Sequence, residues 1–129
     1  MSAPERKTFA KGTLIFKEGE TGREAYMVQH GRVRIFKNVA GRRIPIGIVL
    51  PGQTFGELAL LDGGIRMAAA LAEEDTACLV LTKDAIDHMM HDAPAGLGHL
   101  LRSLIGTMRA MGDDLATARA ELADLRRET

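Results

Sequence analysis

Short apolar runs separated by glycines fill the chain between residues 9 and 81, as in GTLIFKEGETG and TACLVL. Runs of this length and spacing predict short strands joined by turns, and therefore an all-β sandwich or barrel. In RVRIFK the alternation predicts one apolar side and one solvent-facing side. The first side holds Val33, Ile35 and Lys37, and the second holds Arg32, Arg34 and Phe36. The NVAGRR segment that follows predicts a hairpin tip with Gly41 in the turn.

The pattern changes to a helical one after the last of these runs. In TKDAIDHMMHDA, Thr82 is a suitable N-cap and Asp84 lies in the first turn. The segment therefore predicts a short helix that ends before Pro94. His88 and His91 lie three positions apart on this helix, but no third ligand has a convincing spacing, so no metal site is predicted.

A second, longer helix is predicted by apolar residues that recur in steps of four and three, the repeat of a helix that supercoils against a partner. We call this set the heptad stripe: Leu97, Leu101, Leu104, Met108, Met111, Leu115, Ala118, Leu122 and Leu125. A helix over this span is about 43 Å long. Because a small β domain is narrower, the distal half cannot all pack on its own core. A parallel two-helix homodimer is the favoured reading, and a helix folded back on the sheet is the alternative. Gly106 and Gly112 each weaken a helix, so a bend or an interruption is expected there.

Length and charge limit the possible classes of protein. The chain has 129 residues, which fits one domain with a modest appendage, and the change of pattern divides it into residues 1–93 and 94–129. Because 17 basic residues balance 17 acidic ones and no DNA-binding motif is present, direct DNA binding is not expected. The single cysteine, Cys78, lies in an apolar run and predicts a buried small hydrophobe. No secretory signal is evident and no apolar run approaches the ~20 residues of a membrane span, so a cytoplasmic protein is expected.

A carboxylate, Glu57, and a guanidinium, Arg66, stand nine positions apart in the mostly small and apolar segment FGELALLDGGIRMAAALA, residues 55–72. If a strand ends at Phe55 and a helical turn starts at Gly56, the free amides of that turn favour an anion. Arg66 adds a forked contact to the anion's oxygens. Glu57, pointed away from the anion, accepts a hydrogen bond from a sugar hydroxyl. The two charges therefore fit a ribose phosphate. Two other readings stay open, which are solvated surface charges and an ion pair between the two.

The segment FGELALLDGGIRMAA, residues 55–69, resembles the phosphate-binding cassette of the cyclic-nucleotide-binding domain family, and we call it the cassette. The family pattern is Phe-Gly-Glu-hydrophobic-Ala-Leu, a short loop and then Pro-Arg-x-Ala. The upstream positions that resemble the family's glycine-marked strands are Gly12, Ile15, Gly19, Tyr26, Val28, Gly31, Pro51 and Gly52. The resemblance covers residues 9–112 and implies a mainly β fold with C-terminal helices. The fold it implies is a jelly-roll β-barrel followed by a short helix and a long dimerisation helix.

The resemblance also implies roles for residues of the cassette. Glu57 matches the acid that binds the ribose 2′-hydroxyl, and Arg66 matches the arginine on the cyclic phosphate. The complete predicted ligand-binding set is Phe55, Gly56, Glu57, Leu58, Ala59, Arg66, Met67 and Ala68. Met67 stands where cGMP-selective members carry threonine, which favours cAMP and leaves cGMP as the alternative. Ile65 replaces the family's usual proline, which loosens the loop.

These features predict a stand-alone, homodimeric regulatory domain that binds a cyclic nucleotide and acts on an unidentified effector protein in trans. A helical continuation is all that follows Gly112, so no second output domain and no DNA-reading head are expected. No nucleophile has a paired base and no phosphate-loop motif is present, so an enzyme is not expected, nor is a bound cofactor. The alternative is a dimeric interaction scaffold that keeps the fold but binds no nucleotide, with Glu57 and Arg66 as a structural pair.

Overall fold

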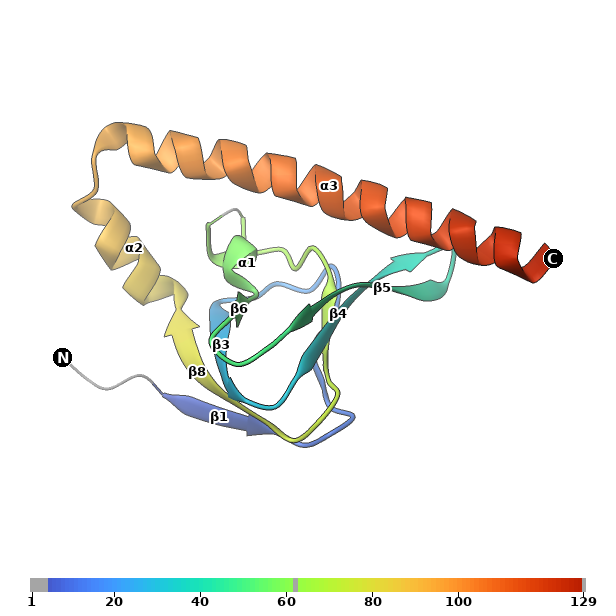
Figure 1. Cartoon of the computed structure of the whole chain (residues 1–129). Coiled ribbons are helices and arrows are strands. Elements are labelled where there is room, and N and C mark those ends of the chain that lie inside the picture. The colour runs from blue at the N-terminus through green and yellow to red at the C-terminus, as the bar shows by residue number, and fades with distance from the viewer. Residues whose placement is uncertain (1–4, 62, 129) are drawn as a thin grey trace.

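The computed structural model describes residues 5–61 and 63–128 as two four-stranded antiparallel sheets followed by helices that lie along one side of them (Figure 1). One sheet has the order β1 (Arg6–Phe9), β8 (Thr76–Thr82), β3 (Glu24–His30) and β6 (Thr54–Phe55). The other has the order β2 (Leu14–Phe16), β7 (Ala69–Ala72), β4 (Val33–Val39) and β5 (Arg42–Val49). The helices are α1 (Glu57–Leu61), α2 (Lys83–His91) and α3 (Ala95–Glu128). The predicted jelly-roll β fold with a short and a long C-terminal helix is confirmed. Within the described residues no ladder joins the two sheets, so they form an open β-roll instead of a closed barrel.

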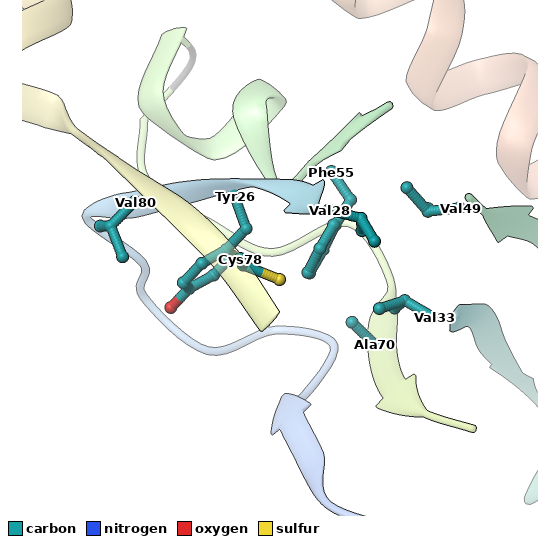
Figure 2. Close-up of a cluster of buried hydrophobic side chains, with 8 residues drawn as sticks. All are labelled: Tyr26, Val28, Val33, Val49, Phe55, Ala70, Cys78 and Val80. Atoms are coloured by element: carbon teal, nitrogen blue, oxygen red, sulfur yellow. The ribbon is translucent and has the colours of Figure 1, made fainter. Parts of the chain in front are cut away.

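The core lies between the two sheets. Its buried side chains are Tyr26, Val28, Val33, Val49, Phe55, Ala70, Cys78 and Val80. Figure 2 shows these side chains, with those of both sheets directed into the same interior. The rings of Tyr26 and Phe55 stack at a centroid distance of 5.2 Å across the β3–β6 pair, and Phe16 packs against both rings. The predicted burial of Cys78 is confirmed, and burial raises the pKa of its thiol to about 11.

The β4–β5 hairpin departs from strict alternation. Its tip is as predicted, because Ala40 and Gly41 both have positive φ values, 52° and 78°, which matches the hairpin turn that suits twisted strands. The register between β4 and β5 shifts between Ile35 and Phe36. The extra residue of this bulge is Ile46 on β5, because Ile35 pairs with Gly47 and Phe36 pairs with Pro45. Lys37, predicted on the apolar side, is buried, whereas Phe36, predicted on the solvent-facing side, is buried as well, with the guanidinium carbon of Arg43 4.8 Å from its ring centroid. The prediction for Phe36 is therefore wrong.

The short helix α2 begins where the sequence places it. The hydroxyl of Thr82 accepts a hydrogen bond from the amide of Ala85 at 3.1 Å, so the predicted N-cap is confirmed. The helix ends at His91, before Pro94. It leaves the end of β8 and leads to α3 (Figure 1), so the two C-terminal helices follow directly from one strand of the roll.

The long helix α3 packs on β4 and β5 through one face (Figure 1). It is continuous, so the interruption considered at Gly106 and Gly112 does not occur. In its distal half, Ala116 and Ala120 are buried against Ile44 of β5, which corrects the view that this half extends beyond its own domain. The heptad stripe points elsewhere, and its exposed large members are Leu97, Leu104, Met108, Met111, Leu115, Leu122 and Leu125. No described helix has the length and apolarity that crossing a membrane requires.

Replacing Gly31 with alanine tests the turn between β3 and β4. The φ of Gly31 is +98°, and an added Cβ would lie 2.5 Å from Oγ1 of Thr76 and 2.6 Å from the carbonyl oxygen of Asp75. We expect Gly31→Ala to lower the free energy of unfolding by about 3 kcal/mol in urea titrations, because backbone strain and steric overlap add. Gly12→Ala is the matched control, since its φ is +88° and no described atom lies within 4 Å of the added Cβ. It should lose only about 1 kcal/mol, and equal losses for the two variants would contradict the steric argument.

Candidate functional site

The cassette starts at a sharp connection between a strand and a helix. Strand β6 ends at Phe55, helix α1 begins at Glu57, and Gly56 joins them with a φ of +80°. A Cβ at Gly56 would lie 2.8 Å from Nη1 of Arg66 and 3.2 Å from Cε2 of Phe16. Both the backbone conformation and the close neighbours therefore require glycine here. The first-turn amides of α1 have no earlier carbonyl within the helix to which they can bond.

The guanidinium of Arg66 is held inside the protein and is 5% exposed. Its Nη1 donates to the carbonyl of Gly56 at 3.0 Å, and its Nη2 donates to the carbonyl of Glu24 at 2.7 Å. The ring of Phe16 lies 4.0 Å from the guanidinium carbon, which adds a cation–π contact. Burial lowers the pKa of Arg66 from its usual value, and the nearby Glu24 and Glu20 charges act in the opposite direction. Arginine nevertheless stays protonated near neutral pH, so the site contains a buried positive charge.

The backbone around Arg66 is fixed by the loop between β2 and β3. The amide of Arg66 donates to the carbonyl of Glu20 at 2.8 Å, and the carbonyl of Arg66 accepts from the amide of Gly19 at 2.8 Å. The amide of Gly22 donates to the carbonyl of Gly64 at 2.7 Å. A Cβ at Gly22 would come within 2.1 Å of Nε of Arg66, so the loop approaches the guanidinium as closely as glycine permits.

A cavity of about 170 Å³ opens beside Arg66 and α1. All eight residues that the sequence predicts for ligand binding line it: Phe55, Gly56, Glu57, Leu58, Ala59, Arg66, Met67 and Ala68. The sequence analysis missed the four other lining residues, which are Phe16, Ile35, Val49 and Thr54. They come from β2, β4, β5 and β6, and no local signal marks them, because sheet pairing decides which strand residues reach the cavity. Three of these four add apolar surface.

Two buried polar atoms in the lining have no hydrogen-bond partner among the described residues: Oε2 of Glu57 and Nε of Arg66. One is an acceptor and the other a donor. Leaving a buried polar group unpaired costs about 1–3 kcal/mol, so native proteins rarely tolerate it without a use. Over the described part of the chain, no ion pair joins Glu57 to Arg66, and Arg66 bonds to backbone carbonyls instead. The structural-pair reading of these two residues therefore lacks support.

Beside this site, the only tyrosine of the chain connects the core to the cavity wall. The hydroxyl of Tyr26 donates to Oε1 of Glu24 at 3.2 Å, and the same carboxylate accepts from Nζ of Lys7 at 2.9 Å. Burial raises the pKa of the phenol to about 12, and the Glu24 charge adds to the shift. The backbone carbonyl of Glu24 also accepts a hydrogen bond from Arg66. Glu24 therefore connects its ion pair with Lys7 to the buried guanidinium.

Comparisons with known proteins point to one family. The model of the family described as "Cyclic nucleotide-binding domain" matches residues 6–93. The cyclic AMP receptor protein of Thermus thermophilus is 34% identical over 102 residues, which cover 78% of this chain and 47% of the relative. The CRP-like cAMP-activated global transcriptional regulator of Mycobacterium tuberculosis is 32% identical over 114 residues, which cover 84% and 49%. This chain thus spans about half the length of these curated relatives. Among solved structures, the cAMP-bound form of the EAL enzyme Bd1971 superposes with a TM-score of 0.81 at 29% identity, covering 96% of this chain and 33% of that one.

The titration of Tyr26 tests the burial of this part of the site. Its folded pKa of about 12 exceeds the ordinary value of 10.0, so the folded state holds the phenolic proton more tightly than the unfolded state does. The contribution of the Tyr26 phenol to the free energy of unfolding is fully present below pH 10. It is lost as the pH rises from 10 to 12, because the phenol of the unfolded chain ionises first. Ultraviolet absorbance of the tyrosinate should show ionisation only toward pH 12. Tyr26→Phe should remove the corresponding slope of stability against pH, and ionisation of the folded protein near pH 10 would contradict the assignment.

Proposed function

This chain belongs to the cyclic nucleotide-binding domain family, and from that premise we propose that it binds cAMP in the cavity beside Arg66. One observation carries the proposal: two residues that line the cavity each carry a buried polar atom without a partner among the described residues, the acceptor Oε2 of Glu57 and the donor Nε of Arg66. A ligand that offers a hydroxyl to the first and an anionic oxygen to the second satisfies both. A cyclic ribose phosphate has this pair of groups.

The chemistry of each anchor follows from its surroundings. The carboxylate of Glu57 accepts a hydrogen bond from the ribose 2′-hydroxyl, and a charged acceptor makes this bond stronger than a neutral one. Nε of Arg66 donates to a phosphate oxygen, while the two terminal nitrogens stay on the carbonyls of Gly56 and Glu24. The guanidinium is therefore oriented before the ligand arrives, which reduces the entropy lost on binding. Phe16 and Val49 supply apolar wall for the rest of the nucleotide.

We take cAMP and not cGMP as the ligand because of the residue after Arg66. Met67 lines the cavity and offers a thioether, which is at most a weak acceptor and donates no hydrogen bond. Polar recognition of guanine by a hydroxyl at this position is thus missing. The printed names of the two bacterial relatives, a cyclic AMP receptor protein and a cAMP-activated regulator, point the same way.

We further propose that the domain is regulatory, forms a homodimer through the heptad stripe and transmits its state to an effector protein in trans. The exposed fractions of Met108 and Met111 are 50% and 64%, and other apolar stripe residues are similarly exposed. Burying a large apolar side chain contributes about 1.5–3 kcal/mol, so a row of them favours pairing of two α3 helices. The spacing of the stripe suits a parallel pair, because it follows the repeat of 3.5 residues that coiled coils use.

Calorimetric titration with cAMP and cGMP tests the binding proposal, with Glu57→Gln as the key variant. The substitution keeps the shape of the side chain but removes the charged acceptor, so we expect cAMP to bind about 10- to 100-fold more weakly, the loss of one hydrogen bond to a charged group. The free energy of unfolding without ligand should stay within about 0.5 kcal/mol of the parent, because Oε2 has no described partner and the substitution breaks no described contact of this atom.

Thermal unfolding provides an independent readout of the same binding. At 100 times its dissociation constant, a ligand stabilises the folded state by about 2.7 kcal/mol. Absence of both heat and a thermal shift at millimolar cAMP and cGMP would overturn the proposal and leave the scaffold reading. A change in stability for Glu57→Gln comparable with its loss of binding would instead indicate a structural role for the carboxylate.

Light scattering tests the homodimer. A variant with both Met108→Glu and Met111→Glu places two charges in the stripe, and it should scatter as a monomer at concentrations where the parent is dimeric. The matched control is Thr117→Glu, which adds a charge at an exposed position of α3 outside the stripe. Since all three positions are exposed, the melting temperature of the monomeric fold should change little. A parent protein that is monomeric throughout would contradict the stripe argument.

A further inference from the structure

A groove lies between the tip of the β4–β5 hairpin and the C-terminal part of α3, two elements that Figure 1 shows side by side. Its volume is about 610 Å³, and none of its described lining residues also lines the cavity beside Arg66. Every charged residue in the described lining is an arginine: Arg42, Arg43, Arg119, Arg126 and Arg127. The whole chain has 17 basic and 17 acidic residues, so this excess of positive charge is local to the groove.

Two distant segments of the chain contribute these arginines. Arg42 and Arg43 begin β5 directly after the turn at Gly41. Arg119 and Arg126 lie about two helical turns apart on α3 and therefore on one side of it. Positive charges in the last turn of a helix suit its dipole, but this local preference does not apply to the hairpin arginines. A hollow lined by one sign of charge raises the local concentration of the opposite charge, so the groove favours an anionic ligand.

Contacts within the protein hold two of the guanidinium groups in place. Nη1 and Nη2 of Arg42 donate to the two carboxylate oxygens of Asp124 at 2.8 and 3.2 Å. Nη1 of Arg119 donates to the carbonyl of Pro45 at 2.8 Å. A guanidinium has more N–H donors than these contacts use. Both arginines are thus oriented and keep further donors for a ligand, which reduces the entropy lost on binding.

Three of the five arginines have no acidic partner in the described structure. Arg43, Arg119 and Arg127 form no ion pair with any residue whose side chain the structure describes. The guanidinium of Arg43 lies over the ring of Phe36, which positions the charge without neutralising it. The three side chains are exposed, so a ligand in the groove can reach them.

The uncharged part of the lining indicates which class of anion fits. It consists of Ile44, Pro45, Leu122 and Ala123, so apolar surface lies beside the arginines. No aromatic ring is present in the described lining, and the stacking surface that single-stranded nucleic acids use is therefore missing. The forked donors of arginine match the two oxygens of a carboxylate. Carboxylates separated by apolar side chains are the groups that an acidic peptide presents.

We propose that the groove binds an extended acidic segment of a partner protein, with carboxylates on the arginines and apolar side chains on Pro45 and Leu122. From Arg119 to Arg127 the helix rises about 12 Å. An extended chain advances about 3.3 Å per residue, so about four residues of the segment lie along the groove. The inference goes beyond the proposed function and stands whether or not the chain binds cAMP.

Fluorescence anisotropy with a defined probe tests the proposal on the full chain. The probe is a fluorescein-labelled hexapeptide that alternates glutamate with leucine, and the control peptide alternates glutamine with leucine. The key variant carries Arg43→Gln and Arg127→Gln, one change on each wall of the groove. The matched control variant carries Arg6→Gln and Arg102→Gln, which remove the same charge from exposed arginines outside the groove.

We expect the acidic probe to bind the parent protein and the glutamine peptide not to bind. The key variant should bind the acidic probe at least about tenfold more weakly, the loss of hydrogen bonds to charged groups. The control variant should stay within about twofold of the parent, because exposed charges at a distance are screened. Both variants should keep the melting temperature of the parent, since all four positions are exposed. In the parent protein, the acidic probe should slow hydrogen exchange at residues 42–46 and 119–127.

Several results would overturn the proposal. Absence of binding at millimolar acidic probe does so, and so does protection from exchange at other residues, which requires no variant to fold. Equal losses of binding in the two variants assign the attraction to net charge instead of the groove. Tighter binding of labelled oligothymidine through the same two arginines makes the groove a nucleic-acid site. If light scattering shows a dimeric parent and a monomeric key variant, the groove is an interface between two copies of this chain.

Discussion

Burial of one guanidinium constrains much of this structure. Arg66 is almost fully withdrawn from water, and its surroundings replace the lost hydration with the carbonyls of Gly56 and Glu24 and with the ring of Phe16. These groups belong to three separate segments of the chain. Each must approach Arg66 closely, and this explains why glycine is required at position 56. Taking a charge out of water is expensive unless it is hydrogen-bonded, so a displacement of any of these segments would affect the others.

The same site keeps two polar atoms unsatisfied, although the rest of the guanidinium is well paired. Oε2 of Glu57 and Nε of Arg66 are buried without described partners and therefore subtract from stability. Proteins accept such costs at functional sites, where groups prepared for a ligand are poorly paired without it. A pair of residues selected only to hold the fold together would bond to each other, which these two do not do. The contrast between a well-anchored guanidinium and its one free nitrogen fits a site built to bind an anion in a fixed orientation.

Local features of this fold could be predicted from the sequence, whereas features that depend on pairing between distant segments could not. The cap at Thr82, the hairpin turn at Gly41 and the connection from β6 to α1 each depend on a few neighbouring residues, and all three were correctly predicted. The burial of Phe36 depends on Arg43 of the neighbouring strand, which lies over its ring, so strict alternation wrongly placed Phe36 on the solvent-facing side.

Helix α3 and the cavity lining show the same difference between features that depend on neighbouring residues and features that depend on distant segments. Helix α3 continues through Gly106 and Gly112 because packing on β4 and β5 outweighs the weak propensity of two residues. Residues of the cassette were identified because they are contiguous and carry a motif. Phe16, Ile35 and Val49 were missed because they reach the cavity only through the pairing of distant strands.

Helix α3 has different faces with different roles, and its rigidity connects them. One face is buried on the hairpin through Ala116 and Ala120, and on the next turn Gly112 accepts the side chain of Met67 from the cassette. Met111, the neighbour of Gly112, belongs to the exposed stripe on another side of the same turn. A continuous helix moves as one body, so a shift at Gly112 also moves Met111. In a homodimer paired through the stripe, a change at the cassette of one protomer would therefore reach the interface within a single helical turn. The short path requires no separate relay, because Met111 and Gly112 are consecutive residues of one continuous helix.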